Sequence, residues 1–314
     1  MKGLELSEKY YQAYGKEILE SQFPEILPYL AVGLAGSGSE CFGFDDDISK
    51  DHDFEPGFCI FIPGEDVIDS RTAFRLERAY AKLPKEFMGF RRSKLSPVGG
   101  NRHGVILISD FFKSKTGRTT GNLKMQDWFS VPEQSLLEAT NGKLFFDHLG
   151  KMTSIREQLN YLPEEVRLKK LAGELLVMGQ AGQYNYPRCV HRKDTAAAQL
   201  AAYEFVKRTL HVIFLLNRNY LPYYKWEFHA LKKLPMLSHL AKPLEYLISC
   251  GNNENTVRKK TELIEHICNE IVAELRMQEL TKYKGTELEG HAYSVNDGVK
   301  DNYVRNLHVM YGVD

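Results

Sequence analysis

The stretch LAVGLAGSGSE, residues 30–40, followed by DHDFEPGFCIFI, residues 51–62, decides the fold that the sequence predicts. Each stretch contains a short apolar run bounded by glycine, serine or acidic residues, which is the pattern of a buried strand. We expect strands over 30–36 and 52–62, in one sheet, with a turn of small residues after the first strand.

Further along the chain, helices and strands alternate. Apolar residues at three-to-four spacing predict helices over 5–22 and 71–83, and HGVILIS at 103–109 predicts a third strand. After these, residues 128–150 contain a helical pattern, an Asn-Gly turn at 141–142 and a short strand at 143–146. This half of the chain therefore has the pattern of a mixed sheet with flanking helices.

The second half is helical in character. Long amphipathic patterns run through the segments 154–162, 164–182, 195–217 and 255–280. We therefore expect an α+β protein with a sheet-bearing domain at 1–150, a helical bundle domain at 151–284 and a tail at 285–314. The tail is polar and weakly patterned, so its structure stays open.

Composition restricts the partners. Lys plus Arg number 41 and Asp plus Glu number 41 among 314 residues, so the summed charge attracts neither long nucleic acid nor an anionic membrane. The five cysteines are odd in number and scattered, which favours reduced thiols in a cytoplasm. No signal-peptide pattern and no apolar run near 20 residues occurs, so we expect a soluble, cytoplasmic protein. Nothing in the sequence indicates the oligomeric state.

Two aspartates in the second stretch are candidates for metal ligands. If residues 51–53 are extended, Asp51 and Asp53 point to the same side, about 6.5 to 7 Å apart. Magnesium takes oxygen ligands and uses one or two protein carboxylates together with substrate phosphates and water. The alternative is a solvated acidic loop, which we favour for the neighbouring Asp45–Asp47 segment.

The turn after the first strand is a candidate for phosphate binding. Gly36, Ser37, Gly38 and Ser39 carry no side chain larger than a hydroxymethyl group, so backbone N–H groups there can approach a phosphate closely. Taken alone, a glycine-serine turn is most often only a turn. The order of strand, turn and acidic pair makes the combination informative.

That order resembles the signature of the polymerase-β-like nucleotidyltransferase superfamily, which includes the aminoglycoside nucleotidyltransferases. The chain is also similar, through the segments 40–58, 188–194 and 220–235, to a bacterial branch described only as a domain of unknown function. The second similarity spans most of the chain.

The superfamily resemblance implies transfer of a nucleoside monophosphate from a triphosphate to a hydroxyl group, with two magnesium ions. It implies that Asp51 and Asp53 bind the metal and that Gly38 and Ser39 hold the triphosphate, with ATP as the expected nucleotide. Members usually add a third carboxylate from a later strand. We assign it to Asp110, at the end of the 103–109 strand; the alternatives are a turn-capping role for Asp110, or Asp127 or Asp147 as the third acid.

Cations should complete the phosphate site. Arg188 and Arg192 are four residues apart, so on a helix they would project together and could bind phosphate oxygens; the alternative is a surface cluster paired with Asp194 and Glu204. Lys225 lies in an aromatic segment that could meet the nucleotide or pack between domains.

Two functions follow from these readings. The first is a nucleotidyltransferase that acts on a hydroxyl of a small molecule, or of a protein or RNA. The second is a catalytically reduced module on the same fold that binds a nucleotide as a regulator or in a toxin-antitoxin pair. Loss of the third carboxylate would favour the second.

Overall fold

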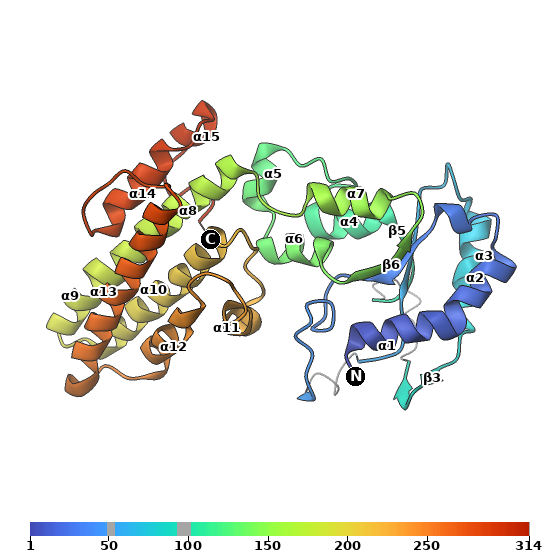
Figure 1. Ribbon diagram of the computed structural model, residues 1–314, viewed down its shortest axis with the longest axis horizontal. Helices are drawn as coiled ribbons and strands as arrows, with labels where there is room; N and C mark the ends of the chain where they lie inside the picture. Colours follow the sequence, from blue (N-terminus) through green and yellow to red (C-terminus); the bar gives the residue numbers. More distant parts are fainter. Residues whose placement is uncertain (49–53, 93–101, 314) are drawn as a thin grey trace. The chain divides into compact units, whose positions relative to one another are not determined.

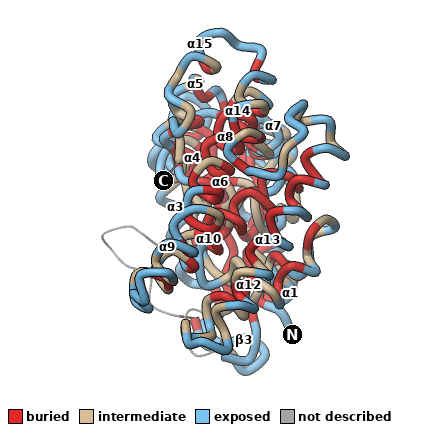
Figure 2. Tube along the Cα trace, turned by 90° about the vertical axis from the view of Figure 1, so that its left-hand side faces the viewer, coloured by how far each residue is buried: buried red, intermediate tan, exposed pale blue. Residues whose placement is uncertain are grey.

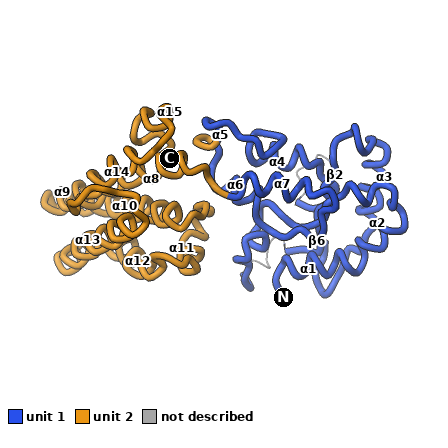
Figure 3. Tube along the Cα trace, turned by 45° about the horizontal axis from the view of Figure 1, so that its top comes forward, with its two compact units in different colours: residues 1–127, 131–160 blue, residues 128–130, 161–314 orange. Residues whose placement is uncertain are grey.

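The computed structural model describes residues 1–48, 54–92 and 102–313, and the chain forms two compact units (Figure 3). Unit 1 comprises residues 1–127 and 131–160, and unit 2 comprises residues 128–130 and 161–314. Unit 1 contains a four-stranded sheet, whereas the described part of unit 2 is helical (Figure 1). The expected α+β class is confirmed.

The sheet of unit 1 has the strand order β5-β2-β1-β6. The central strand β1 runs antiparallel to both β2 and β6, while β2 and β5 are parallel. Every residue of β1 and β2 is buried, which explains why both read as continuous apolar runs. The strands are β1 (Ala31–Leu34), β2 (Cys59–Ile62), β5 (Gly104–Leu107) and β6 (Lys143–Asp147).

The predicted helix over residues 5–22 is present, with a π-helical turn in its middle. It consists of α1 (Gly3–Tyr10), the π-helix Tyr11–Gly15 and α2 (Lys16–Gln22). Tyr10 and Tyr11 both pack on Phe58: the ring centroid of Phe58 lies 5.9 Å from that of Tyr10 and 5.3 Å from that of Tyr11. This aromatic cluster joins the first helices to the segment that enters β2.

The crossover from β2 to β5 contains α3 (Ser70–Ala81), as expected. Its N-terminus is capped by Asp69, whose Oδ1 accepts the Thr72 N–H at 2.9 Å. After α3 comes a short hairpin that we did not predict, β3 (Glu86–Phe87) and β4 (Phe90–Arg91). Two-residue strands are too short to leave an alternating pattern in a sequence.

Two strands are shorter than the sequence predicts. The run expected to be a strand over 52–62 forms β2 only from Cys59 onward, and residues 54–58 are not in a strand. The strand expected over 103–109 forms β5, which ends at Leu107, and α4 (Ile108–Thr116) begins at the next residue. The placement of Asp110 at a strand end is therefore wrong: it lies in the first turn of α4.

The last part of unit 1 agrees with the sequence. Helix α6 (Glu133–Thr140) is followed by the Asn141-Gly142 turn and by β6, with Gly142 at φ +72°. Helix α5 (Met125–Ser130) crosses the division between the units. Helix α7 (Lys151–Gln158) groups with unit 1, whereas the sequence pattern predicts that the helical domain begins at Lys151.

Unit 2 is built around α8 and α10, which are largely buried (Figure 2). Helix α8 packs against α10 and α14, and α10 also packs against α12. The 285–314 segment, which the sequence left open, contains α14 and α15. The helices of unit 2 are α8 (Glu164–Gly179), α9 (Tyr186–His191), α10 (Thr195–Leu216), α11 (Glu227–Leu231), α12 (Ala241–Ser249), α13 (Glu254–Met277), α14 (Leu288–Asp297) and α15 (Asn302–Asn306). None of the helices in the described parts of the chain has the length and apolar character needed to cross a membrane.

A cluster of charged side chains lies inside unit 2. Glu174 of α8 is fully buried and contacts two residues of α10: its Oε1 lies 2.9 Å from His211 Nδ1, and both oxygens lie 3.3 Å from Arg208 Nη1. Burial by itself would raise the pKa of Glu174, but the His211 and Arg208 contacts outweigh it and the pKa is lowered. Glu174 therefore stays ionised as part of a charged network between α8 and α10.

Candidate functional site

The glycine-serine turn leaves β1 through two glycines in a backbone conformation that other residues rarely adopt. Gly36 has φ +114° and Gly38 has φ +125°. Beyond them a tight turn begins, in which the Cys41 N–H donates to the Gly38 carbonyl at 3.1 Å and the Phe42 N–H to the Ser39 carbonyl at 3.2 Å.

The start of this turn has free backbone donors. Among the described residues, the N–H groups of Gly38, Ser39 and Glu40 form no hydrogen bond. Unpaired N–H groups that follow one another at the start of a turn favour an anion, because their dipoles add. The local geometry is compatible with the phosphate cradle that the sequence predicts, and we name residues 36–40 the phosphate turn after that prediction.

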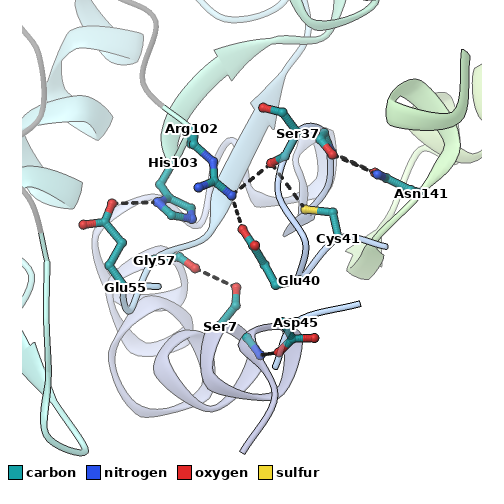
Figure 4. A network of polar contacts seen from close by, with 12 residues as sticks. Ser7, Ser37, Glu40, Cys41, Asp45, Glu55, Gly57, Arg102, His103 and Asn141 are labelled. Carbon is teal, nitrogen blue, oxygen red and sulfur yellow. Dashed lines mark hydrogen bonds and ion pairs between the residues drawn. The ribbon is translucent and has the colours of Figure 1, made fainter. Parts of the chain in front are cut away.

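Asn141, in the turn between α6 and β6, binds the backbone of the phosphate turn. The Gly36 N–H donates to Asn141 Oδ1 at 2.9 Å, and Asn141 Nδ2 donates to the Gly36 carbonyl at 2.8 Å. Close by, the Gly142 N–H donates to the Cys41 carbonyl at 2.9 Å. The turn between α6 and β6 thus fixes Gly36 at the start of the phosphate turn and Cys41 just after its end; Figure 4 shows the Asn141 contact.

An arginine lies across the same turn. Arg102 Nη2 donates to the Ser37 carbonyl at 2.9 Å and forms an ion pair with Glu40 (Figure 4). The side chain of Glu40 is 9% exposed and that of Arg102 is 25% exposed. A Cβ atom on Gly38 would overlap Arg102 Nη2 and would lie 2.5 and 2.7 Å from the Glu40 carboxylate oxygens. Gly38 is thus required for this close approach as well as for its φ angle.

The segment that enters β2 is held by a second set of contacts. His103 is buried and its Nδ1 lies 3.1 Å from Glu55 Oε1, while Ser7 Oγ donates to the Gly57 carbonyl at 2.6 Å (Figure 4). Gly57 lies directly under the His103 ring, because a Cβ atom there would lie 2.7 Å from His103 Cγ. These contacts join α1, the start of β2 and the start of β5.

Asp45 has a structural role that the sequence did not reveal. We favoured a solvated loop for Asp45–Asp47, but Asp45 is 3% exposed and its Oδ2 accepts the Gly3 N–H at 2.8 Å. It therefore binds the N-terminal end of α1, where a carboxylate is favoured by the free N–H groups and the helix dipole. Asp46 and Asp47 are exposed, as expected.

A cavity of about 1240 Å³ opens beside the phosphate turn, larger than the roughly 300–1,000 Å³ of an ordinary small-molecule site. It runs along β5 and is bordered by α3 and α4. Its described lining includes polar or glycine residues that bear on the site: Gly36, Ser37, Arg102, His103, Asp110 and Lys115. Among the sequence-predicted residues, the structure thus brings Gly36, Ser37 and Asp110 to one cavity.

Of the three candidates for a third carboxylate, Asp147 ends β6, whereas Asp110 and Asp127 lie on helices α4 and α5. Strand β5 carries no acidic residue, and Asp110 is exposed in the first turn of α4. The two alternatives are engaged elsewhere: Asp127 accepts both nitrogens of Arg118 at 2.9 and 2.7 Å, and these hydrogen bonds lower its pKa. Asp147 Oδ2 accepts the Thr153 N–H at 2.8 Å. Asp110 remains the candidate, on a different element from the expected one.

The proposed metal ligands Asp51 and Asp53 lie outside the described residues. Within residues 1–48, 54–92 and 102–313, no group of three or more His, Cys, Asp and Glu side chains is arranged to hold a metal ion. The magnesium site therefore stays a prediction from the sequence.

Thiol chemistry at this site is disfavoured. Burial raises the pKa of Cys41, which follows the phosphate turn, and raises that of Cys59 in β2 to about 12. Since the thiolate is the reactive form, neither cysteine is a nucleophile near neutral pH.

The cations expected from the second half of the chain belong to unit 2. Arg188 and Arg192 lie at the C-terminal end of α9, both exposed, and Arg188 Nη1 donates to Tyr184 Oη at 2.7 Å. The acids expected to pair with them have other roles: Asp194 caps α10, and Glu204 pairs with Arg208. Lys225 lies 5.2 Å above the Trp226 ring, a cation–π contact. Their roles in nucleotide binding stay predictions.

The residues that the sequence reasoning missed are Arg102, Glu40 and Asn141. Each lies next to a segment that was singled out: Glu40 ends the phosphate turn, Arg102 precedes the third strand, and Asn141 is in the Asn-Gly turn. The sequence does not show that these residues meet, because Arg102 and Glu40 are 62 residues apart in the chain and Asn141 and Gly36 are 105 residues apart.

Comparison with protein-family models gives a match to part of the chain. A family model described as a domain of unknown function, DUF4037, matches residues 128–227, which is 100 of the 314 residues. The matched range includes the RCVHRKD segment and α10 but not the phosphate turn or Asp51 and Asp53. A similarity search gave no match to a curated protein.

Proposed function

We propose that this protein is a magnesium-dependent nucleotidyltransferase that transfers a nucleoside monophosphate from a triphosphate, with ATP as the expected donor, to a hydroxyl group of a small molecule. The acceptor class follows from the neutral net charge, which does not favour a long nucleic acid. A protein or RNA hydroxyl is the other acceptor within this proposal.

The observation that carries the proposal is the phosphate turn. Its two glycines with positive φ, its free N–H groups and the position of Gly36 and Ser37 in the lining of a cavity favour binding of an anionic ligand. The turn is followed in sequence by Asp51 and Asp53, so a phosphate cradle and a pair of carboxylates occur in the order that the superfamily resemblance requires.

In the proposed reaction the acceptor oxygen attacks the α-phosphorus, a new P–O bond forms, and the bond to the β-phosphate oxygen breaks so that pyrophosphate leaves. Bound magnesium would stabilise the charge on the attacking and leaving oxygens. The N–H groups of the phosphate turn would orient the triphosphate, and Asp110 is the candidate to accept the hydroxyl proton.

The test is nucleotide binding in the wild type beside the double variant D51N/D53N. A ligand that binds only the native state raises the unfolding temperature. We expect stabilisation by ATP with magnesium in the wild type, and its loss in the variant. Pyrophosphate release with pooled hydroxyl-bearing acceptors would then identify the second substrate. A wild type that no triphosphate stabilises would contradict the proposal.

A catalytically reduced nucleotide-binding module is the second candidate function. It is favoured by the absence of an acidic residue from β5 and by the exposure of Asp110 on α4. Nucleotide binding without pyrophosphate release in any acceptor pool, and unchanged binding in D110N, would support the module over the enzyme.

A further inference from the structure

Arg102 is the cation nearest to the phosphate turn among the contacts that the structure describes. Its Nη2 donates to the Ser37 carbonyl at 2.9 Å and pairs with Glu40, and it lies so close to Gly38 that a Cβ atom there would overlap it. The guanidinium therefore lies directly above the backbone that the proposed function assigns to the triphosphate.

Arg102 pairs with Glu40, and a carboxylate is an unusual neighbour for a phosphate-binding site. The side chain of Glu40 is 9% exposed, and its carboxylate would repel an anion bound to the N–H groups of Gly38 and Ser39. Paired with Arg102, its charge is neutralised. A planar guanidinium is also the group best suited to bind phosphate oxygens through two parallel hydrogen bonds.

We infer that Arg102 is the phosphate-binding cation of this turn, and that Glu40 holds it in place until a triphosphate of the donor nucleotide competes for it. This inference rests on the proposed function, since it names how the donor is recognised at the same site. Arg102 and Ser37 both line the cavity beside β5, so the guanidinium can meet a ligand there without leaving the turn.

The inference makes opposite predictions for the two partners. Loss of Arg102 removes a hydrogen bond to a charged ligand, so R102Q is expected to weaken binding about 10- to 100-fold. Loss of the Glu40 charge removes the competitor, so E40Q is expected to tighten binding roughly 3- to 10-fold. An ion pair that only supports the turn would instead make both variants weaker.

The experiment is calorimetric titration of the full-length protein with magnesium tripolyphosphate and, separately, with magnesium ATP. Tripolyphosphate isolates phosphate recognition from base recognition. R102K, which keeps the charge, is expected to bind between the wild type and R102Q. The double variant E40Q/R102Q leaves no lone buried charge and is expected to bind as weakly as R102Q. R118Q is the matched control, because Arg118 forms its ion pair with Asp127 in the same unit and is expected to leave binding unchanged.

The outcomes separate this inference from the proposed function. Binding of ATP by the wild type with equal affinity in R102Q would overturn the role of Arg102 and leave the proposed function standing. Equal weakening in E40Q and R102Q, with lower unfolding temperatures in both, would also overturn it in favour of a structural ion pair. A wild type that binds neither ligand would contradict both.

Discussion

The side-chain amide of Asn141 pairs with the backbone of Gly36 through two reciprocal hydrogen bonds, of 2.9 and 2.8 Å, across 105 residues of chain. The pairing also assigns the amide, because the Gly36 N–H needs an oxygen opposite it and the Gly36 carbonyl needs a nitrogen. One polar side chain therefore connects the phosphate turn to the start of β6.

Replacing Asn141 by alanine should loosen the phosphate turn. It removes both hydrogen bonds and leaves two backbone groups of Gly36 unpaired, so we expect a loss of about 1–3 kcal/mol in the free energy of unfolding. Urea denaturation measures this, with N122A, an exposed asparagine of unit 1, as the control. Equal stability of N141A and N122A would show that the pairing does not hold the turn.

Gly38 should tolerate no side chain. Alanine there would have to adopt φ +125° and would overlap Arg102 Nη2, so we expect G38A to lose about 1–3 kcal/mol of stability and most of its triphosphate binding. Gly43 is the matched control: it also has positive φ, +68°, but nothing lies within 4 Å of a Cβ atom there. We expect G43A to lose about 1–2 kcal/mol through backbone strain alone and to keep its binding. If G43A loses binding as well, the Gly38 effect is not specific to the site.

Glu227 should make unit 2 less stable as the pH rises. Burial raises the pKa of Glu227 to about 7, against the opposing effect of His211 and Lys207. Below about pH 4.5 the Glu227 carboxyl is protonated in both the folded and the unfolded state. Between about pH 4.5 and pH 7 it ionises readily only in the unfolded chain, so the free energy of unfolding falls over this range. The difference in free energy of unfolding between E227Q and the wild type should therefore shift in favour of E227Q by about 1–3 kcal/mol from pH 4.5 to pH 8. This range is discounted for the partial exposure of Glu227.

Unfolding curves at pH 4.5, 6 and 8 would measure this gain. E262Q is the control, because Glu262 is exposed and pairs with Arg258 on the surface of α13. A difference between E227Q and wild type that stays constant across these pH values would contradict the raised pKa.

Glu174 should stabilise unit 2 in the opposite pH range. Burial alone would raise the pKa of Glu174, but His211 and Arg208 lower it below its usual value. The ionised carboxylate therefore stabilises the folded state above about pH 4.5, and this stabilisation is lost as the pH falls below that value. Breaking a buried charged contact costs roughly 3–5 kcal/mol, so E174Q should be that much less stable at pH 7. The gap in urea midpoint between E174Q and the wild type should narrow as the pH falls below about 4.5, and a gap of the same size at pH 7 and at pH 3.5 would contradict the lowered pKa.

Much of the fold could be predicted from local patterns. The helices over 5–22 and 71–83, the strand at 30–36, the Asn-Gly turn and the helical second half all follow from apolar spacing and turn residues. The apolar stripe of α13 packs in the core, since Ile264, Ile267 and Ile271 are buried. Strand limits do not follow from such patterns, because β5 passes directly into α4 through a continuous apolar run that fits either structure.

The candidate site could be predicted only in part. Gly36–Ser39 is recognisable from its own composition, because only small residues allow the backbone of that turn. The burial of Asp45 was not predictable, since three successive aspartates have the composition of a solvated loop and only the position of the α1 N-terminus gives one of them a partner.

By itself the sequence determined the α+β class, the order of the longer elements within residues 1–284 and a turn of small residues followed by an acidic pair, because each depends on neighbours within a few positions. Only the tertiary structure decided which side chains meet at that turn. Arg102 and Asn141 reach Glu40 and Gly36 of the turn from two separate segments, since strand pairing brings the C-terminal end of β1 and the N-terminal ends of β5 and β6 to one edge of the sheet. Contacts over such separations depend on register and on the packing of the whole sheet, which no local pattern encodes.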